Sequence, residues 1–263
     1  MTARLLIIAG SDSGGGAGIQ ADIKTVTMLG GHAMTAITAI TAQNTLGVQA
    51  VHPVPTDIVL AQIDSVVSDI GVDAVKIGMI GSAQTADAVA DRLTSMFSRD
   101  PIPIIFDPVM IASSGSVLAD PDTIAAFARL MRIATLVTPN LPELAALGGE
   151  AAVRALGPAV LLKGGHGEGE QITDRLVTDA GDTRWTNPRI ETRHAHGTGC
   201  TLASGIAAGL AQGMLLDAAI ERAIAFVRAA LAQPPGLGAG HGPMGHALGV
   251  SPFDQLKDRK CPA

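Results

Sequence analysis

The chain has 263 residues, 47% of them hydrophobic and 16% charged, which is enough to bury a full core in one large domain or two small ones. A net charge of −6 and only 2% aromatic residues argue against a protein that binds nucleic acids through phosphate contacts or base stacking. The first apolar run is too short for a signal peptide, no apolar stretch is long enough to span a membrane, and two distant cysteines, Cys200 and Cys261, predict no disulfide framework, so we expect a cytoplasmic protein.

The first predicted unit is a strand, a glycine-rich loop and a helix. Residues 4–10 form a short apolar run that predicts a buried strand. A helix is expected from about Gly18, with Ile19, Ile23 and Val26 on its buried face. Residues 33–44 are rich in β-branched side chains and predict a second strand that ends near Gln43.

Short apolar runs then continue to alternate with amphipathic segments. Further strands are predicted within 73–81, 102–110, 134–140 and 158–165, and helices within 56–70, 85–97, 122–131 and 141–147. Residues 174–190 alternate around a central turn and predict an edge hairpin, whereas 234–249 are loop-like. Alternation of this kind predicts an α/β fold of three layers, in which helices cover both faces of a mostly parallel sheet.

Polar residues stand at the carboxyl ends of the predicted strands, where parallel sheets bind their ligands. They are Asp12, Gln43, Lys76, Asp107, Asn140 and Lys163. Each of the two lysines either reaches solvent or meets a phosphate group.

Asn140 and Glu143 are three residues apart at the start of a predicted helix. A carboxylate at a helix start is explained by the helix dipole alone. The alternative is a water-mediated hold on Mg²⁺, which prefers carboxylate ligands and keeps several of its waters.

Two glycine-rich turns lead into helices. In "HAHGTGCTLASG", residues 194–205, the turn either binds an anion with its backbone N–H groups or caps a buried helix. Gly205, Gly209 and Gly213 follow at every fourth position, and we expect this bare face to pack tightly against the sheet. The other turn, "AGSDSGGGAGIQAD", lacks the lysine of a P-loop, and its Asp12 either contacts a ligand or caps the turn.

Seven motifs in chain order resemble those of the hydroxymethylpyrimidine/phosphomethylpyrimidine kinases of thiamine synthesis, which belong to the ribokinase-like superfamily. The motifs are "AGSDSGGGAGIQADIKT", "TAQNTLGV", "KIGM", "DPVM", "TPNLPE", "LLKGGH" and "HGTGCTLASG". The resemblance implies a single ribokinase-like α/β/α kinase domain over residues 1–263. It also implies an enzyme that uses ATP and Mg²⁺ to phosphorylate 4-amino-5-hydroxymethyl-2-methylpyrimidine to its monophosphate and then to the diphosphate.

The resemblance also implies site residues, position by position. Gln43 would pair with the amino group and ring nitrogen of the pyrimidine, and the pocket around it would be lined by Asp12, Ala17, Asp22 and Met79. The nucleotide and Mg²⁺ region would comprise Thr138, Asn140, Lys163 and Thr198, with Glu143 and Asp107 toward the metal. The anion hole and catalytic turn would be Gly197, Thr198, Gly199 and Cys200, with Lys163 near the phosphates.

One position departs from the family pattern. The family often has Pro-Ser-Gly-Gly where this chain has Ser13-Gly14-Gly15-Gly16, and the extra glycine is expected to loosen the loop over the pyrimidine.

Cys200 stands where sugar kinases of the superfamily place an aspartate that acts as a base. Our hypothesis is that a thiol suits two nucleophiles, because the second one is a phosphate already ionised at neutral pH, which a fixed carboxylate would repel. A helix N-terminus can lower the pKa of a thiol, so a thiolate is expected to serve the first step. The alternative is that Cys200 only packs as a small apolar side chain.

Two other functions compete with this interpretation. Relatives of the family phosphorylate pyridoxal-type vitamins, which carry a hydroxymethyl group on a flat nitrogen ring. A non-catalytic pyrimidine-binding protein is the other alternative, although Lys163, Glu143 and the glycine loop argue against it. We expect small-molecule substrates and a homodimer, because exposed sheet edges in such folds are often paired.

Overall fold

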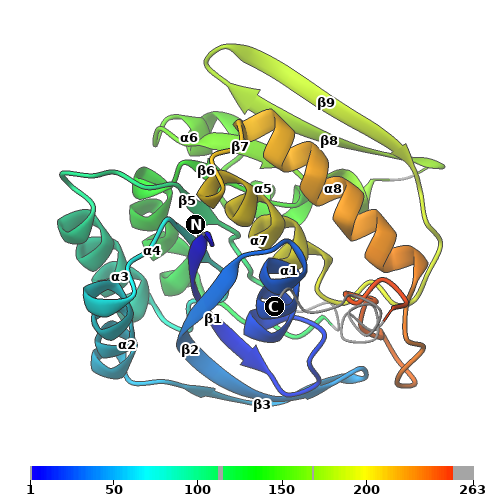
Figure 1. The fold of residues 1–263 in the computed structure, drawn as a ribbon, viewed down its shortest axis with the longest axis horizontal. Helices are drawn as coiled ribbons and strands as arrows, with labels where there is room; N and C mark the ends of the chain where they lie inside the picture. Colours follow the sequence, from blue (N-terminus) through cyan, green and yellow to red (C-terminus); the bar gives the residue numbers. More distant parts are fainter. Residues whose placement is uncertain (1, 112–114, 168, 251–263) are drawn as a thin grey trace, which may run out of the picture.

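The computed structural model describes residues 2–111, 115–167 and 169–250, and in these residues one sheet of nine strands lies between helices (Figure 1). The strands are β1 Arg4–Asp12, β2 His32–Asn44, β3 Gly47–Pro53, β4 Ala74–Ile77, β5 Ile104–Phe106, β6 Leu136–Val137, β7 Ala159–Leu162, β8 Gln171–Thr178 and β9 Gly181–Pro188. The helices are α1 Gly18–Met28, α2 Thr56–Asp69, α3 Ala83–Met96, α4 Pro121–Ile133, α5 Leu141–Ala146, α6 Glu150–Arg154, α7 Thr198–Ala211 and α8 Leu216–Ala232, with a 3₁₀ turn η1 at Gly164–His166.

The sheet has the order β3-β2-β1-β4-β5-β6-β7-β8-β9. The strands from β2 to β7 in this order run parallel, whereas β3 joins β2 antiparallel at one edge. At the other edge β8 and β9 form the antiparallel hairpin that the sequence predicts, and it projects beyond the helices (Figure 1). The mostly parallel α/β/α architecture is therefore confirmed.

Each face of the sheet packs on its own apolar core. Along β1 the side chains of Leu5 and Ile7 face α1, α7 and α8, and those of Leu6 and Ile8 face α2, α3 and α4. All four side chains are buried. A strand that is buried on both faces needs an uninterrupted apolar run, and for this reason the sequence of residues 4–10 predicts a buried strand.

The buried face of α1 differs from the prediction. Ile19 and Val26 are buried, but the Ile23 side chain is 38% exposed. Asp22 and Thr25 take the interior positions instead, because Asp22 forms an ion pair with the buried Lys76. The helical spacing of apolar residues cannot predict that a carboxylate will be buried because it has an ionic partner elsewhere in the chain.

The glycines of α7 face a helix and not the sheet, which corrects the sequence-based expectation. A Cβ on Gly209 would lie 2.7 Å from the Cβ of Ala219, and one on Gly205 would lie 3.0 Å from that of Ala223. Both alanines belong to α8, so the bare face lets two helix backbones approach closely. Gly213 follows the end of α7 and has a φ of +82°.

Three elements were not anticipated, namely β3, α6 and α8, whereas the predicted loop at 234–249 contains no helix or strand. No helix within the described residues has the length and apolar character needed to cross a membrane. Cys261 lies outside the described residues.

Candidate active site

A cavity of about 840 Å³ opens at the carboxyl ends of the parallel strands. All six polar residues that the sequence places at strand ends line it: Asp12, Gln43, Lys76, Asp107, Asn140 and Lys163. Of the other predicted site residues, the cavity is also lined by Ala17, Met79, Glu143, Gly197, Thr198, Gly199 and Cys200. The topology of the sheet thus brings together side chains that are far apart in the chain.

Asp12 organises the first glycine loop. Its carboxylate accepts hydrogen bonds from the backbone N–H groups of Gly14, Gly16 and Ala17 at 2.8–3.0 Å. Burial opposes ionisation of this group, but these donors together with His196 lower the pKa of Asp12. The loop is therefore held in place by hydrogen bonds, and a loosening by its extra glycine stays a prediction.

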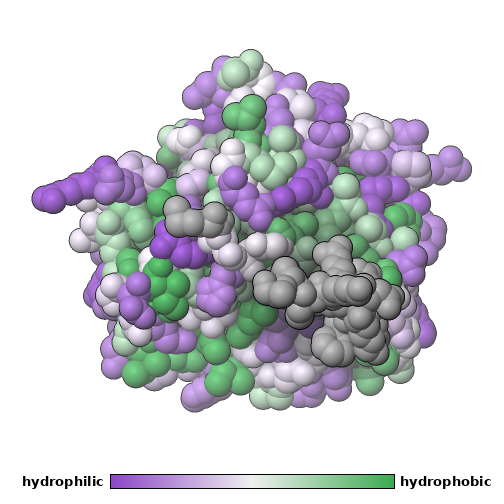
Figure 2. All heavy atoms as spheres, viewed as in Figure 1, coloured by the Kyte–Doolittle hydropathy of each residue, from purple (hydrophilic) through white to green (hydrophobic). Residues whose placement is uncertain are grey.

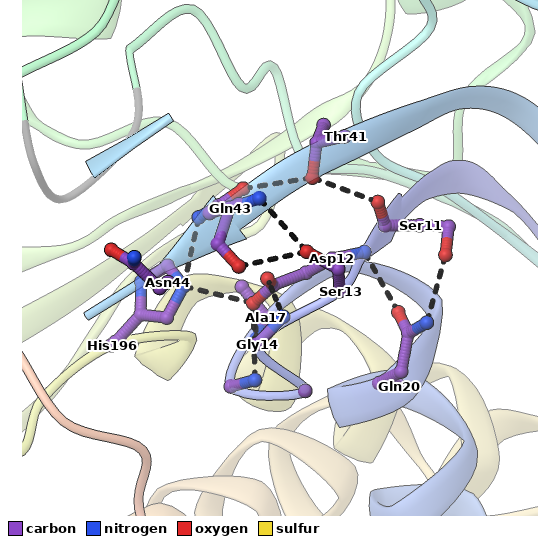
Figure 3. A network of polar contacts seen from close by, with 12 residues as sticks. Ser11, Asp12, Ser13, Gly14, Ala17, Gln20, Thr41, Gln43, Asn44 and His196 are labelled. Carbon is purple, nitrogen blue, oxygen red and sulfur yellow. Dashed lines mark hydrogen bonds and ion pairs between the residues drawn. The ribbon is translucent and has the colours of Figure 1, made fainter. Parts of the chain in front are cut away.

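Gln43 lies beside this loop at the end of β2 (Figure 3). Its side-chain Nε2 lies 3.1 Å from Nε2 of His196, and its Oε1 lies 3.2 Å from Oγ1 of Thr41. His196 Nε2 also lies 3.0 Å from Oδ2 of Asp12. The backbone is fixed as well, because Ser13 Oγ donates to the Gln43 carbonyl oxygen and accepts from its N–H, both at 2.8 Å.

The second glycine turn touches the first. Gly197 precedes α7 with a φ of +88°, and a side chain there would collide with the carbonyl oxygen of Gly16. Only glycine fits this position. Thr198, Gly199 and Cys200, at the start of α7, therefore line the same cavity as Gln43, and this end of the helix carries the positive end of the helix dipole. The Thr198 N–H donates to the Ala195 carbonyl oxygen at 3.4 Å.

Cys200 is a neutral thiol in this setting. Burial raises the pKa of Cys200 to about 11, and the charges of Asp22 and Asp107 act in the same direction, against the opposing effect of Lys76 and the Gly18 N–H. Burial and two nearby carboxyl groups thus act against the thiolate that was expected at the helix N-terminus.

Lys163 joins two carboxyl groups beside Gly199 at the start of α7. Its Nζ lies 2.7 Å from Oδ1 of Asp107 and 3.5 Å from Oε2 of Glu143. Burial opposes its charge, but attraction to these carboxylates prevails and raises the pKa of Lys163 to about 12. Burial likewise raises the pKa of Glu143, with Asp107 adding to the effect.

Asn140 and Glu143 form a reciprocal cap at the start of α5. The Asn140 side chain accepts from the Glu143 N–H, and the Glu143 carboxylate accepts from the Asn140 N–H, both at 2.8 Å. The structural role anticipated for these residues is thus present, while both also line the cavity.

Two predicted site residues lie behind the cavity wall. Asp22 is fully buried, and its carboxylate accepts from Lys76 at 2.8 Å and from Ser204 at 2.7 Å. Thr138 is also fully buried and donates to Asp107 at 3.1 Å. Neither residue is among those that line the cavity, and each forms a hydrogen bond with a residue that does line it, Lys76 or Asp107. Contact of Asp22 or Thr138 with a ligand stays a prediction.

Lys76 does not reach solvent, although it lines the cavity, and its ammonium group forms an ion pair with Asp22 at 2.8 Å. Its side chain is fully buried. Burial disfavours its charge, yet the attraction of Asp22 outweighs this cost and raises the pKa of Lys76.

The sequence did not single out several residues that line the cavity. His196 is one, and its position directly before Gly197 was the available signal. Asp174 on β8 is another, and it accepts from the Gly164 N–H at 2.9 Å. An apolar wall from α7 and α8 contains Leu202, Ile224 and Val227. No local pattern could assign these three apolar residues to a cavity, because helical periodicity alone predicts them as ordinary core positions.

No cluster of three or more His, Cys, Asp and Glu side chains that could hold a metal occurs among the described residues. Asp107 and Glu143 do line the cavity as a pair of carboxyl groups. Such a pair fits Mg²⁺, which is held through one or two carboxylates, waters and substrate phosphates more often than by a complete set of protein ligands.

Comparison with known proteins places the chain among vitamin kinases. The family model described as phosphomethylpyrimidine kinase matches residues 12–245. A hydroxymethylpyrimidine/phosphomethylpyrimidine kinase of Rhizobium meliloti is 49% identical over 94% of this chain and 97% of its own length. The thiamine biosynthesis bifunctional protein ThiED of Geobacter sulfurreducens is 48% identical, and the alignment covers 97% of this chain and 54% of that protein. A solved ADP complex of Bacillus subtilis pyridoxal kinase has a TM-score of 0.85 and 32% identity, covering 94% of this chain and 98% of that one.

Proposed function

The chain belongs to the phosphomethylpyrimidine kinase family and is a phosphotransferase, and we propose that it uses ATP to phosphorylate 4-amino-5-hydroxymethyl-2-methylpyrimidine and then its monophosphate in thiamine biosynthesis. One observation carries the proposal: the two glycine turns touch at Gly16 and Gly197, so that Gln43 and the start of α7 face one cavity. A ring held at Gln43 is then within reach of a phosphoryl group bound at the helix.

Gln43 supplies ring recognition. A primary amide has both a donor and an acceptor, which matches the adjacent ring nitrogen and amino group of the pyrimidine. Ala17 and Met79 line the cavity nearby and provide an apolar surface for a flat ring. Asp12 acts through the loop, because its carboxylate already accepts three backbone N–H groups.

The start of α7 supplies the anion site. The N–H groups of Gly199 and Cys200 would stabilise charge on the transferred phosphoryl group beside Thr198, and Lys163 would neutralise the phosphates. Asn140 would lie beside the nucleotide, whose base fits the apolar wall of Leu202, Ile224 and Val227. Asp107 and Glu143 would hold Mg²⁺ through waters; the bound ion would neutralise phosphate charge during transfer.

Cys200 enters this scheme as a neutral thiol. Its pKa of about 11 leaves it uncharged at neutral pH, so it adds no repulsion toward a phosphate nucleophile. Phosphoryl transfer depends more on positioning and charge stabilisation than on a strong base, so the first step does not require a thiolate.

Pyridoxal-type vitamins are the second candidate substrates. The observation in their favour is the close structural match to the Bacillus subtilis pyridoxal kinase. The higher identity to the pyrimidine kinase of Rhizobium meliloti favours the pyrimidine.

Product analysis tests the proposal. The protein is incubated with Mg-ATP and either hydroxymethylpyrimidine or pyridoxal, and mono- and diphosphates are separated by chromatography. We expect pyrimidine monophosphate followed by diphosphate. Faster turnover of pyridoxal would favour the second candidate, and ligand binding without any phosphorylated product would support a non-catalytic protein.

We further propose that the chain forms a homodimer through the β3 edge. Five of the seven residues of β3 are exposed, and apolar side chains including Val51, Leu46 and Ile40 are exposed there. Hydrophobic residues gather along the lower margin of the molecule near α2 and β3 (Figure 2). Light scattering of the wild type and of Val51→Lys tests this, since the charge should give a monomer.

A further inference from the structure

The polar contacts of His196 conflict with the orientation of the Gln43 amide. His196 Nε2 lies 3.0 Å from Oδ2 of Asp12 and 3.1 Å from Nε2 of Gln43 (Figure 3). The Asp12 carboxylate accepts from three backbone N–H groups, so it is an acceptor toward His196 as well. The imidazole must therefore carry its proton on Nε2, because two acceptors 3.0 Å apart without a proton between them would repel each other.

A protonated Nε2 cannot accept a hydrogen bond from the Gln43 amide nitrogen. The contact with Thr41 also indicates that the amide is reversed. Thr41 Oγ1 donates its one proton to the Ser11 carbonyl oxygen at 3.0 Å, so it has no proton left for Gln43 Oε1. Thr41 Oγ1 is then an acceptor toward Gln43. Rotating the amide by about 180° exchanges two atoms of the same shape and turns both mismatched contacts into hydrogen bonds.

We propose that His196 sets the orientation of the Gln43 side-chain amide, with the imidazole Nε2–H shared between Asp12 Oδ2 and Gln43 Oε1, and with Gln43 Nε2 donating to Thr41. His196 is in this sense a positioning residue for substrate recognition. Gln43 keeps one acceptor position on the His196 side and one N–H on the Thr41 side.

The orientation decides which way round a ring binds, an inference that rests on the proposed function. Along the edge of the pyrimidine the ring nitrogen, the amino group and the hydroxymethyl group follow one another. The amino group would donate to Gln43 Oε1 and the ring nitrogen would accept from Nε2. The hydroxymethyl group then lies on the His196 side, next to Gly197 and the start of α7. The opposite orientation of the amide would turn the ring over and point the hydroxymethyl group away from that turn.

His196 is held firmly enough for this role. Its side chain is buried, and a Cβ on Gly16 would lie 2.6 Å from its Cδ2, so the glycine loop packs directly on the ring. Its backbone N–H donates to the Gly242 carbonyl oxygen at 3.2 Å. A ring fixed by packing and by an ionised partner imposes its polarity on the more flexible glutamine.

Calorimetric titration with two ligands of opposite polarity tests the proposal. One ligand is 4-amino-5-hydroxymethyl-2-methylpyrimidine, and the other is its 4-oxo analogue, which presents a ring N–H donor and a carbonyl acceptor. The wild type should bind the amino ligand more tightly. In His196→Ala the Gln43 amide can rotate to suit either ligand. We therefore expect the Kd of the 4-oxo analogue divided by that of the amino ligand to fall about tenfold, the effect of losing one hydrogen bond that fixes the amide.

Two further variants separate polarity from packing. His196→Gln places an N–H donor near the position of Nε2 and should retain most of the discrimination. His196→Asn fills much of the same space, but its amide is too short to reach Gln43, so its ratio should resemble that of His196→Ala. The exposed His32 at the start of β2 provides a control substitution, His32→Ala, that should leave the ratio unchanged.

The result that would overturn the proposal is a Kd ratio unchanged in His196→Ala and His196→Asn, even where both affinities fall together. The proposed function fails by a different result, namely a wild type that forms no phosphorylated pyrimidine. Because the Kd ratio is measured by binding, it tests the role of His196 whether or not turnover occurs. If neither ligand bound to the wild type, the role of His196 and the proposed function would both be overturned.

Discussion

The two glycine turns meet where Gly197 lies against Gly16, yet the side chains on either side of that contact are held by different forces. On the recognition wall, which we define as Asp12, Thr41, Gln43 and His196, the contacts are hydrogen bonds around a single carboxylate. On the charged wall, defined as Lys76, Asp107, Glu143 and Lys163 with Asp22 behind it, three carboxyl groups surround two ammonium groups.

The difference reflects what each wall has to distinguish. Hydrogen bonds between neutral groups depend on direction and can tell one ring edge from another, but each contributes only about 1 kcal/mol. Buried charges attract phosphates strongly, but removal of one partner leaves the other without compensation. The charged wall should therefore be costly to disrupt, and the recognition wall should lose selectivity before it loses stability.

Removal of Lys76 should have the largest effect. Lys76→Met leaves the Asp22 carboxylate buried beside Ser204, and we expect a loss of about 3–5 kcal/mol in the free energy of unfolding, measured with urea. Arg4→Met breaks the exposed pair with Asp73 and should change stability far less. Similar losses in the two variants would contradict the distinction between buried and surface pairs.

Substitution of Lys163 should act on the reaction more than on folding. Lys163→Met removes the ammonium group that lines the cavity beside Asp107, and kcat should fall about 10²–10³-fold, as expected for loss of transition-state charge stabilisation. Steady-state kinetics with hydroxymethylpyrimidine measures this, with Arg129→Met on the surface of α4 as the control. A rise in KM with unchanged kcat would assign Lys163 to ground-state binding instead.

A histidine behind the start of α7 should make stability depend on pH. His246 is buried, its Nε2 lies 2.9 Å from Oγ1 of Thr201, and burial lowers the pKa of His246 to about 4. The unfolded chain binds a proton near pH 6.5 and the folded protein only near pH 4, so this contribution is present above pH 6.5 and is lost as the pH falls toward 4.

The loss across this window should be on the order of 2–3 kcal/mol. Urea unfolding of the wild type and of His246→Gln between pH 7 and pH 4 isolates it, because the glutamine cannot titrate. Parallel pH profiles for the two proteins would show that His246 does not carry the effect.

The smallest effect is a difference between the two phosphorylation steps. Cys200→Asp places a further carboxyl group near Asp22 and Asp107, and a phosphate nucleophile should be repelled more than an alcohol. We expect the second step to fall about tenfold more than the first, less than the full ~4 kcal/mol for two charges 4 Å apart at a dielectric of 20, because the cavity is open to water. Cys200→Ser should affect both steps alike, and an equal loss of both steps in Cys200→Asp would refute the charge argument.

The part of the candidate site that lies at the ends of strands could be predicted from the sequence. Asp12, Gln43, Asp107 and Lys163 each follow an apolar run, and parallel strands bring such positions to one edge. The ionic partners were not predictable, because Asp22 and Lys76 are 54 positions apart and nothing local links them. Strand β3 was also not predicted, and neither was α8, although the sequence of Leu216–Ala232 is amphipathic.

By itself the sequence determined the layered fold and the polar strand ends that reach the cavity, since hydrophobic periodicity and chain order specify which strand ends meet. Only the tertiary structure decided the chemical state of those residues. Cys200 begins a helix, which favours a thiolate, but burial beside two carboxyl groups keeps it protonated. His196 precedes a glycine turn, but its contact with Gln43, 153 positions away, gives the amide its direction. Protonation and polarity depend on neighbours in space, and those are set by packing.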